Sequence, residues 1–219
     1  MKILICNSKN WFRLDKTNLS HIDFEQISKK EELNLKFLDS IMPKYIFFVH
    51  WNWFVSEEVF NKYECILFHT SPLPYGRGGS PIQNLILNGF TKSPVCALRM
   101  NQELDVGPIY LKKNVSLKGS LSQIFVRINK VINIFIIKIT KEEIIPKEQK
   151  GKIFNFTRLS KKDNKLPEDL NLKELFDRIR MIDDKDYPNA FLHYGNLKFE
   201  FSNATLKNNE IIVTCKISK

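Results

Sequence analysis

Residues 64–87 read ECILFHTSPLPYGRGGSPIQNLIL, and this stretch decides the fold. The strand predicted at residues 64–69 is continuously apolar at 65–68, which is typical of a strand buried on both faces of a parallel sheet. It ends at His69, and two prolines, a glycine-rich turn and a helix with proline in its first turn follow, over residues 81–88. Because open α/β sheets bind ligands at the carboxyl ends of their strands, we expect His69 to lie at a binding edge.

The rest of the first half alternates strand and helix patterns in the same way. Strands are predicted at residues 2–6, 23–27, 45–50, 94–99 and 109–115, and helices at residues 31–41, 56–62 and 121–141. This order predicts a Rossmann-like α/β fold, with a mostly parallel sheet and helices on both faces.

The alternation of strand and helix patterns stops after the last of these helices. We therefore predict a catalytic domain over residues 1–141 and a small α+β extension over residues 142–219. In the extension, residues 142–169 indicate a surface loop and residues 170–182 a helix. Strands at 197–201 and 211–217 flank Asn208 and Asn209, which favour a hairpin turn.

The formal net charge is +10, and a basic chain can bind nucleic acid, a membrane surface or a small anion. The lysines are scattered and lack interleaved aromatic residues, so we attribute the charge to composition and expect no nucleic-acid partner. The most apolar stretch, residues 124–139, is too short to span a bilayer. Met1 opens directly on a strand and shows no signal peptide, which favours a cytoplasmic protein.

The four cysteines, Cys6, Cys65, Cys96 and Cys215, form no C-x-x-C pair. They predict core residues in a reducing compartment, and no metal site. The first strand is followed by neither G-x-G-x-x-G nor G-K-[ST], which argues against dinucleotide chemistry and NTP hydrolysis.

Two stretches carry candidate chemistry. The first is His69 with the turn that follows it, where Arg77 and the free amides at the start of a helix would favour an anion. The second is Asp105, which precedes a Gly-Pro turn; it could orient the His69 ring if the two lie close. The alternative for each is structural, a buried histidine beside a capped turn and an aspartate in an Asx-turn.

The order of these two motifs resembles the formyltransferase family, which includes glycinamide ribonucleotide, methionyl-tRNA and sugar N-formyltransferases. The matching residues are His69, Ser71, Leu73, Pro74, Arg77, Gly78 and the run Leu104-Asp105-Val106-Gly107-Pro108. The resemblance implies a folate-dependent enzyme with N10-formyltetrahydrofolate as co-substrate, no metal, and His69 and Asp105 as catalytic residues. The family's asparagine falls at Leu67, so Asn52 is the candidate that replaces its oxyanion contact.

The resemblance also implies binding residues. The pterin would lie against Leu98, Arg99, Met100, Leu104, Asp105 and Val106. The acceptor would contact Tyr75, Arg77, Gly78, Gly79, Arg180 and Tyr187.

The acceptor is predicted from the loop at residues 75–86, which resembles a sugar N-formyltransferase branch that includes the pseudaminic acid pathway enzyme. Our first hypothesis is a nucleotide-linked amino sugar, a UDP-4-amino-4,6-dideoxy sugar for surface glycan biosynthesis, with a possible homodimer through the C-terminal strands. The first alternative is a methionyl-tRNA formyltransferase; the basic charge favours it, but the chain is short for a tRNA-binding C-terminal domain. A glycinamide ribonucleotide formyltransferase ranks third, and a non-catalytic binding protein for nucleotide sugars or nucleic acid is the alternative of another class.

Overall fold

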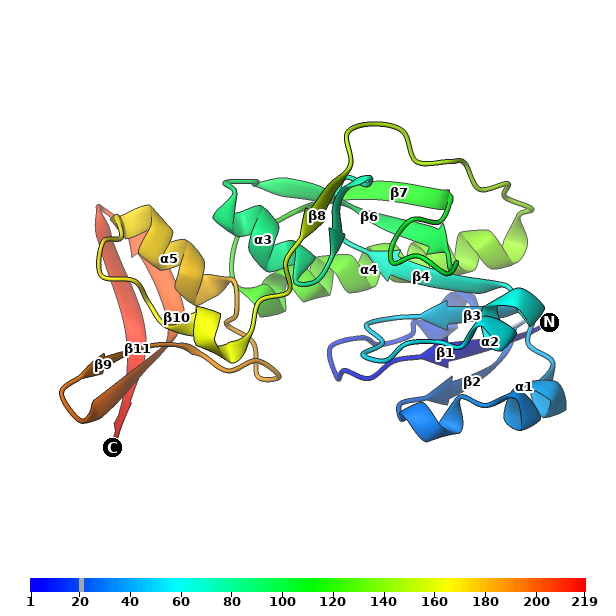
Figure 1. Ribbon diagram of the computed structural model, residues 1–219, viewed down its shortest axis with the longest axis horizontal. Coiled ribbons are helices and arrows are strands. Elements are labelled where there is room, and N and C mark those ends of the chain that lie inside the picture. The colour runs from blue at the N-terminus through cyan, green and yellow to red at the C-terminus, as the bar shows by residue number, and fades with distance from the viewer. Residues whose placement is uncertain (20–21) are drawn as a thin grey trace.

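The computed structural model describes residues 1–19 and 22–219 and has the predicted α/β architecture (Figure 1). The main sheet has the order β2 (Asp23–Ile27), β1 (Lys2–Cys6), β3 (Tyr45–Phe48), β4 (Cys65–His69), β6 (Lys92–Arg99) and β7 (Ile109–Ser116). The helices of this part are α1 (Leu35–Ile41), α2 (Glu57–Lys62), α3 (Pro81–Leu87) and α4 (Leu121–Lys141). The predicted helix at residues 31–41 begins late, because the Asn34 side chain accepts from the Phe37 amide and caps the helix there.

The first four strands of this order are parallel, but β6 runs antiparallel to both of its neighbours. A loop without a helix joins β6 to β7, so the chain returns directly instead of crossing over. His69 at the end of β4 pairs with Cys96, whereas Arg99 at the end of β6 pairs with Ile66 near the start of β4. The two strands therefore end at opposite edges of the sheet.

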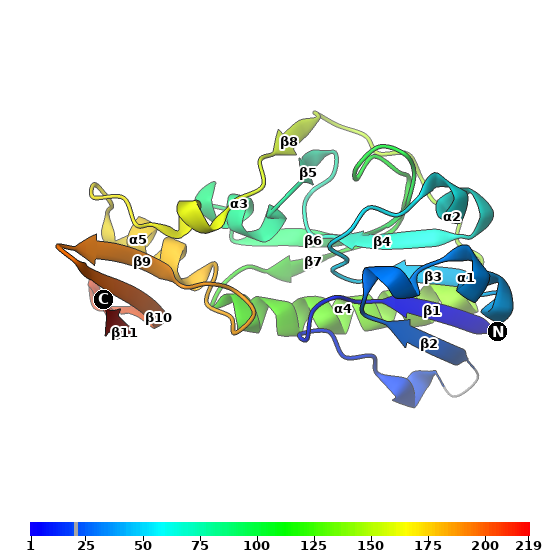
Figure 2. The ribbon, with the colours of Figure 1, turned by 60° about the horizontal axis from the view of Figure 1, so that its bottom comes forward.

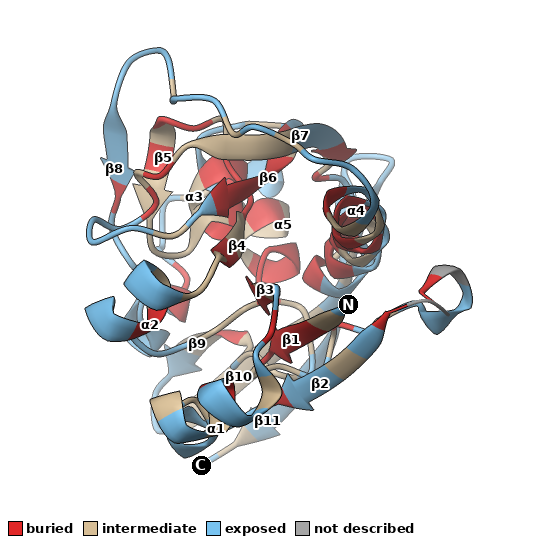
Figure 3. Ribbon diagram, turned by 90° about the vertical axis from the view of Figure 1, so that its right-hand side faces the viewer, coloured by how far each residue is buried: buried red, intermediate tan, exposed pale blue. Residues whose placement is uncertain are grey.

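Helices cover both faces of the sheet, and alternate side chains of each strand divide between them. Ile3 and Ile5 pack in the cluster that includes α3 and α4, whereas Leu4 and Cys6 pack with α1 and α2. Figure 2 shows α4 running along the length of the sheet. Burial is concentrated in the central strands and the inward face of α4 (Figure 3).

Helix α4 confirms the predicted amphipathic helix. Its first turn is closed by a capping box, in which the Ser120 hydroxyl accepts from the Gln123 amide and the Gln123 side chain accepts from the Ser120 amide. Most of its apolar side chains are buried in the core, whereas Val126 and Ile134 are exposed. Within the described residues, no helix is both long enough and apolar enough to cross a membrane.

The C-terminal extension consists of α5 (Leu172–Arg180) and an antiparallel sheet of β9 (Ala190–Tyr194), β10 (Leu197–Lys207) and β11 (Glu210–Ser218). Asn208 and Asn209 have φ angles of 50° and 60°, so the predicted hairpin turn is confirmed. Strand β9 was not predicted. Ile212 and Ile217 are exposed on this sheet, the surface for which the sequence suggested a dimer contact.

Two further strands lie outside the prediction, β5 (Tyr75–Gly78) in the loop after His69 and β8 (Phe154–Phe156) in the segment predicted as surface loop. They pair in parallel, so residues 142–160 contact the first domain. Short 3-10 turns occupy Lys16–Asn18, Lys30–Glu32 and Lys161–Asn164.

The cysteine prediction is confirmed for three residues and wrong for one. Cys6, Cys65 and Cys96 are buried, and burial raises the pKa of the Cys65 and Cys96 thiols to about 12. Cys215 is exposed, because it lies on the edge strand β11.

Candidate active site

His69 is the last residue of β4 and is buried, with 7% of its surface exposed. Its Nε2 lies 2.7 Å from the Gly76 carbonyl oxygen, and its Nδ1 lies 3.4 Å from Oδ2 of Asp105. A carbonyl only accepts, so Nε2 carries a proton and donates it. Nδ1 then faces a carboxylate, and the contact is favourable only when a second proton lies between the two side chains.

Asp105 is held in place from both its side chain and its backbone. It has a φ of 57°, an unusual conformation for a residue other than glycine, and it is buried. Its Oδ2 accepts from the Gly78 amide at 2.9 Å, which ties the second motif to the turn after His69. The structure thus brings together two residues that β5, α3 and β6 separate in the sequence.

Gln149 completes this arrangement and was missed by the sequence prediction. Its Nε2 donates to the carbonyl oxygens of Asp105 at 2.7 Å and Gly107 at 2.9 Å. Its Oε1 accepts from Nε and Nη2 of Arg77 at 3.1 and 2.8 Å. One amide therefore fixes both the Asp105 loop and the arginine of the predicted acceptor loop. No motif marks a lone glutamine in a lysine-rich segment, so no sequence signal could have found it.

Two glycines allow these loops to approach other backbone. A Cβ on Gly107 would lie 1.8 Å from the Arg99 carbonyl oxygen. Gly78 has a φ of 98°, and its Cβ would lie 2.7 Å from the Phe156 carbonyl oxygen. Any side chain at these positions would push the Asp105 loop or the turn after His69 out of place.

The predicted pterin residues divide between two places. Asp105 faces His69, but Leu98 is fully buried and packs with Leu73 and Cys96, and the Leu104 side chain is exposed. Arg99 donates from Nε to the Glu64 carboxylate at 2.8 Å and also contacts the Tyr110 hydroxyl, so its side chain points away from His69. The pKa of Tyr110 is raised, mainly by burial and then by Glu64.

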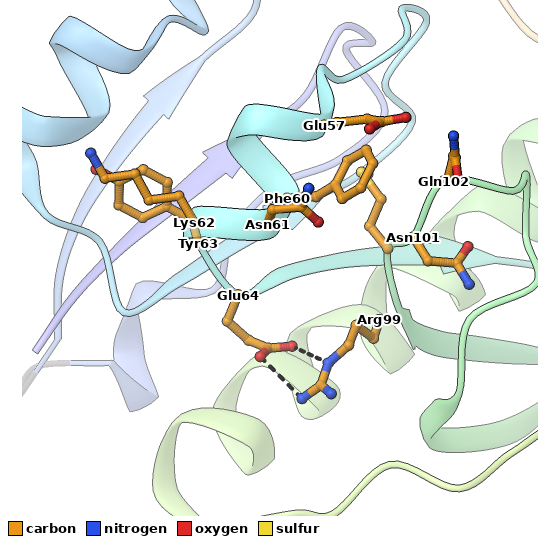
Figure 4. A pocket seen from close by; sticks show the side chains of 10 residues that line it. Glu57, Phe60, Asn61, Lys62, Tyr63, Glu64, Arg99, Asn101 and Gln102 are labelled. Atoms are coloured by element: carbon orange, nitrogen blue, oxygen red, sulfur yellow. Dashed lines mark hydrogen bonds and ion pairs between the residues drawn. The ribbon is translucent and has the colours of Figure 1, made fainter.

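A polar cavity of about 500 Å³ adjoins this second place (Figure 4). Its walls come from α2 and from the residues that follow β6 and precede β4, among them Glu57, Phe60, Glu64, Arg99, Met100 and Gln102. It shares Arg99 and Met100 with the predicted pterin site, and its loop continues toward Asp105.

The residues predicted to contact the acceptor also lie in different parts of the structure. Tyr75 stacks on Phe154, with 5.0 Å between ring centroids, and Gly79 packs against Arg158. Tyr187 lies close to Lys9, whose Nζ is 5.3 Å from the ring centroid, and burial raises the pKa of the Tyr187 hydroxyl.

Arg180 occupies a different environment from the other predicted acceptor residues. It is buried, and its Nε donates to Asp177 at 2.6 Å while its Nη1 donates to the carbonyl oxygens of Leu117 and Gly119. These contacts give Arg180 a structural role at the junction with the extension and do not support its predicted substrate contact.

Leu67 and Asn52 lie on neighbouring segments of the sheet's binding edge. Leu67 is half-buried among apolar side chains, and Asn52 is exposed on the loop after β3.

Two buried polar atoms, Nε1 of Trp51 and Oγ of Ser71, lack a hydrogen-bond partner within residues 1–19 and 22–219. The same ranges contain no group of three or more metal-ligating side chains.

These features are matched in known proteins. The family model described as formyl transferase matches residues 3–131, and the chain belongs to the formyl transferase family. A second model, described as methionyl-tRNA formyltransferase, C-terminal domain, matches residues 161–218.

Named relatives are similar over most of the chain. Methionyl-tRNA formyltransferase of Thermotoga maritima is 30% identical over 200 residues, which is 87% of this chain but 63% of the relative. The solved methionyl-tRNA formyltransferase from Clostridium thermocellum is 34% identical with a TM-score of 0.93, covering 100% of this chain and 99% of that one. HypX from Aquifex aeolicus, solved in complex with tetrahydrofolic acid, shares the fold with a TM-score of 0.71 at 15% identity, over 95% of this chain and 39% of its own.

These findings correct the predicted acceptor. The nucleotide-linked amino sugar, the pseudaminic acid branch and the glycan pathway are wrong, because the C-terminal model, the Thermotoga maritima relative and the Clostridium thermocellum structure all carry the name methionyl-tRNA formyltransferase. The exclusion of nucleic acid as a partner is wrong for the same reason. The argument from length also fails, because a solved chain that this one covers almost completely carries that name.

Proposed function

We propose that the chain transfers a formyl group from N10-formyltetrahydrofolate to the amino group of methionyl-tRNA. The observation that carries this proposal is the buried His69–Asp105 pair at the carboxyl end of β4, in a chain whose two parts match formyl transferase and methionyl-tRNA formyltransferase models. The net charge of +10 supports a polyanionic acceptor. In this proposal residues 1–141 supply His69 and Asp105, Gln149 positions the Asp105 loop, and the rest of the extension assists the acceptor.

The His69–Asp105 pair is suited to holding and moving one proton. The amine of the acceptor must lose a proton on acylation, and a formyl carbonyl develops negative charge. With Nε2 bound to the Gly76 carbonyl oxygen, Nδ1 faces Asp105, so the Nδ1–Oδ2 pair is the acceptor for the proton that the amine releases. Asp105 fixes the orientation of the ring.

The co-substrate supplies the formyl carbon, and this carbon must reach His69. A flat heteroaromatic ring needs a cavity with apolar walls and a few amide groups. The 500 Å³ cavity offers Phe60 and Met100 with Asn61, Asn101 and Gln102, but it lies near the start of β4, at the edge opposite His69. We therefore propose that the formyl-bearing end of the folate lies beside Asp105, at the edge that holds His69. Asn52 stays our candidate for the polar contact that Leu67 cannot make.

Formylation of methionyl-tRNA tests the proposal directly. The chain, 10-formyltetrahydrofolate and methionyl-tRNA are expected to give N-formylmethionyl-tRNA, detected after ester hydrolysis. Because general acid–base groups contribute roughly 10²–10⁴-fold, His69→Asn should lower kcat by at least about 100-fold. His193→Asn is the matched control, since His193 is an exposed histidine on β9. Full turnover by His69→Asn would remove the catalytic assignment, and an inactive wild-type chain that still binds tRNA would favour a non-catalytic binding protein.

A further inference from the structure

A second histidine occupies the same edge of the sheet. Phe48 of β3 pairs with Leu67 of β4, and His50 and His69 each follow that pair by two residues. His50 has a φ of 53°, and its ring packs edge-on against the stacked rings of Trp11 and Phe125, with centroid distances of 5.9 and 6.2 Å. The Ser8 hydroxyl donates to the His50 carbonyl oxygen at 2.5 Å, which fixes this backbone turn to the loop after β1.

The His50 ring is fixed in one protonation form. Trp11 donates from Nε1 to Nδ1 of His50 at 3.3 Å, and because an indole N–H can only donate, Nδ1 is unprotonated. Burial first, then Lys9 and Arg158, lower the pKa of His50 to about 4, against a smaller opposing effect of Asp186 and Asp184. The ring is therefore neutral at pH 7 with its proton on Nε2, and Nε2 has no hydrogen-bond partner in the described part of the chain.

Among the charged groups around His50, the side chains of Lys9 and Arg158 are free to bind an anion. Neither Lys9 nor Arg158 forms an ion pair within residues 1–19 and 22–219; the Lys9 ammonium contacts the Asp186 carbonyl oxygen at 3.5 Å and lies over the Tyr187 ring. The carboxylates of Asp184 and Asp186 accept hydrogen bonds from uncharged donors. The Asp186 carboxylate accepts from the Asn10 amide, and that of Asp184 accepts from the Asp186 amide and the Ser122 hydroxyl.

We propose that the Nε2–H of His50, together with Lys9 and Arg158, binds a phosphate-ester oxygen of the formyl acceptor next to His69. A phosphate offers acceptors only, which suits one neutral donor and two cations. Because its tautomer is fixed, His50 donates the Nε2–H to the phosphate and takes no part in the proton transfer assigned to His69 and Asp105. Arg158 also packs against Gly79, so the same anion would lie next to the turn after His69. This inference rests on the proposed function, because it assumes a nucleic-acid acceptor.

Equilibrium binding of labelled, uncharged tRNA to the full chain tests the contact without the formylation reaction. Loss of a hydrogen bond to a charged group costs roughly tenfold or more, so His50→Phe should weaken binding about tenfold. His50→Gln, whose amide can reach the position of Nε2, should stay within about threefold of wild type. The double variant Lys9→Met with Arg158→Met should reduce the slope of log K against log salt by about 1, as loss of one phosphate contact does. Lys36→Met, an exposed lysine on α1, should leave the slope unchanged.

A nitrogen-15 NMR experiment keeps the proposal testable if His50→Phe fails to fold. In the wild-type chain, His50 should show the Nε2–H tautomer at pH 7, and its Nε2 signal should shift on addition of tRNA. Wild-type binding with an unshifted His50 signal, or with unchanged affinity in His50→Phe, overturns this inference and leaves the proposed function standing. A wild-type chain that binds no tRNA overturns both.

Discussion

Replacing Gln149 by glutamate exchanges one NH₂ group for an oxygen, and we expect it to lower kcat/KM for formylation about 30-fold. The amide donates to the carbonyl oxygens of Asp105 and Gly107 at 2.7 and 2.9 Å, and both bonds are lost. Each is worth about 1 kcal/mol, so the loop that presents Asp105 to His69 loses about 2 kcal/mol. Since about 1.4 kcal/mol corresponds to a factor of ten in rate, this loss gives roughly 30-fold if the loop must be ordered in the transition state.

The assay is steady-state formylation with a urea unfolding curve for each variant. Gln149→Glu retains the acceptor for Arg77 and adds a carboxylate charge beside it, so the loss of activity comes from the Asp105 side of the amide. Glu148→Gln is the matched control, because it makes a change of the same size on the neighbouring exposed residue. A Gln149→Glu enzyme within twofold of wild type would refute the reasoning, since the loop would then be held without the amide.

Three further predictions concern stability. Gly107→Ala places a Cβ 1.8 Å from the Arg99 carbonyl oxygen, so it should lower both Tm and activity, and a wild-type Tm would contradict this. Asp177→Ala leaves the Arg180 charge buried without its carboxylate and should cost about 3 kcal/mol in urea unfolding; a cost below about 1 kcal/mol would show that the carbonyl contacts suffice. His50 has a folded pKa of about 4 against 6.5 when unfolded, so its contribution is complete above pH 6.5 and declines as the pH falls toward 4. That loss amounts to about 3 kcal/mol and should be absent from His50→Phe, so an identical pH dependence of unfolding in that variant would contradict it.

The main elements could be predicted from the sequence because their signals are local. The apolar runs at β1, β3 and β4 and the capped amphipathic pattern of α4 each lie within one short window. Strand β5 could not be predicted in this way, since Tyr-Gly-Arg-Gly has poor strand propensity and becomes a strand only by pairing with β8. The direction of β6 was not predicted, although the absence of a helix between β6 and β7 indicates an antiparallel pair.

The candidate site was predicted in part, for a related reason. His69 and Asp105 belong to motifs, so their meeting was a prediction that geometry could test. Gln149 and Arg158 contact segments distant in sequence, and nothing in their own neighbourhood marks them. The resemblance implied that the pterin lies against Leu98 and Arg99. The antiparallel pairing of β6 with β4 places these residues toward the edge opposite His69.

The path of residues 142–160 bears on how such a chain can be recombined. This segment returns across the first domain: β8 pairs with β5, Asn84 donates to the Thr157 carbonyl oxygen, and the Leu159 amide donates to the Ser80 hydroxyl. A chimera joined at residue 141 would carry the His69 motif but would receive its partner for the Asp105 loop from a foreign sequence. The C-terminal unit therefore cannot be exchanged by joining two chains at residue 141. We expect a junction after residue 160 to preserve the His69–Asp105 site.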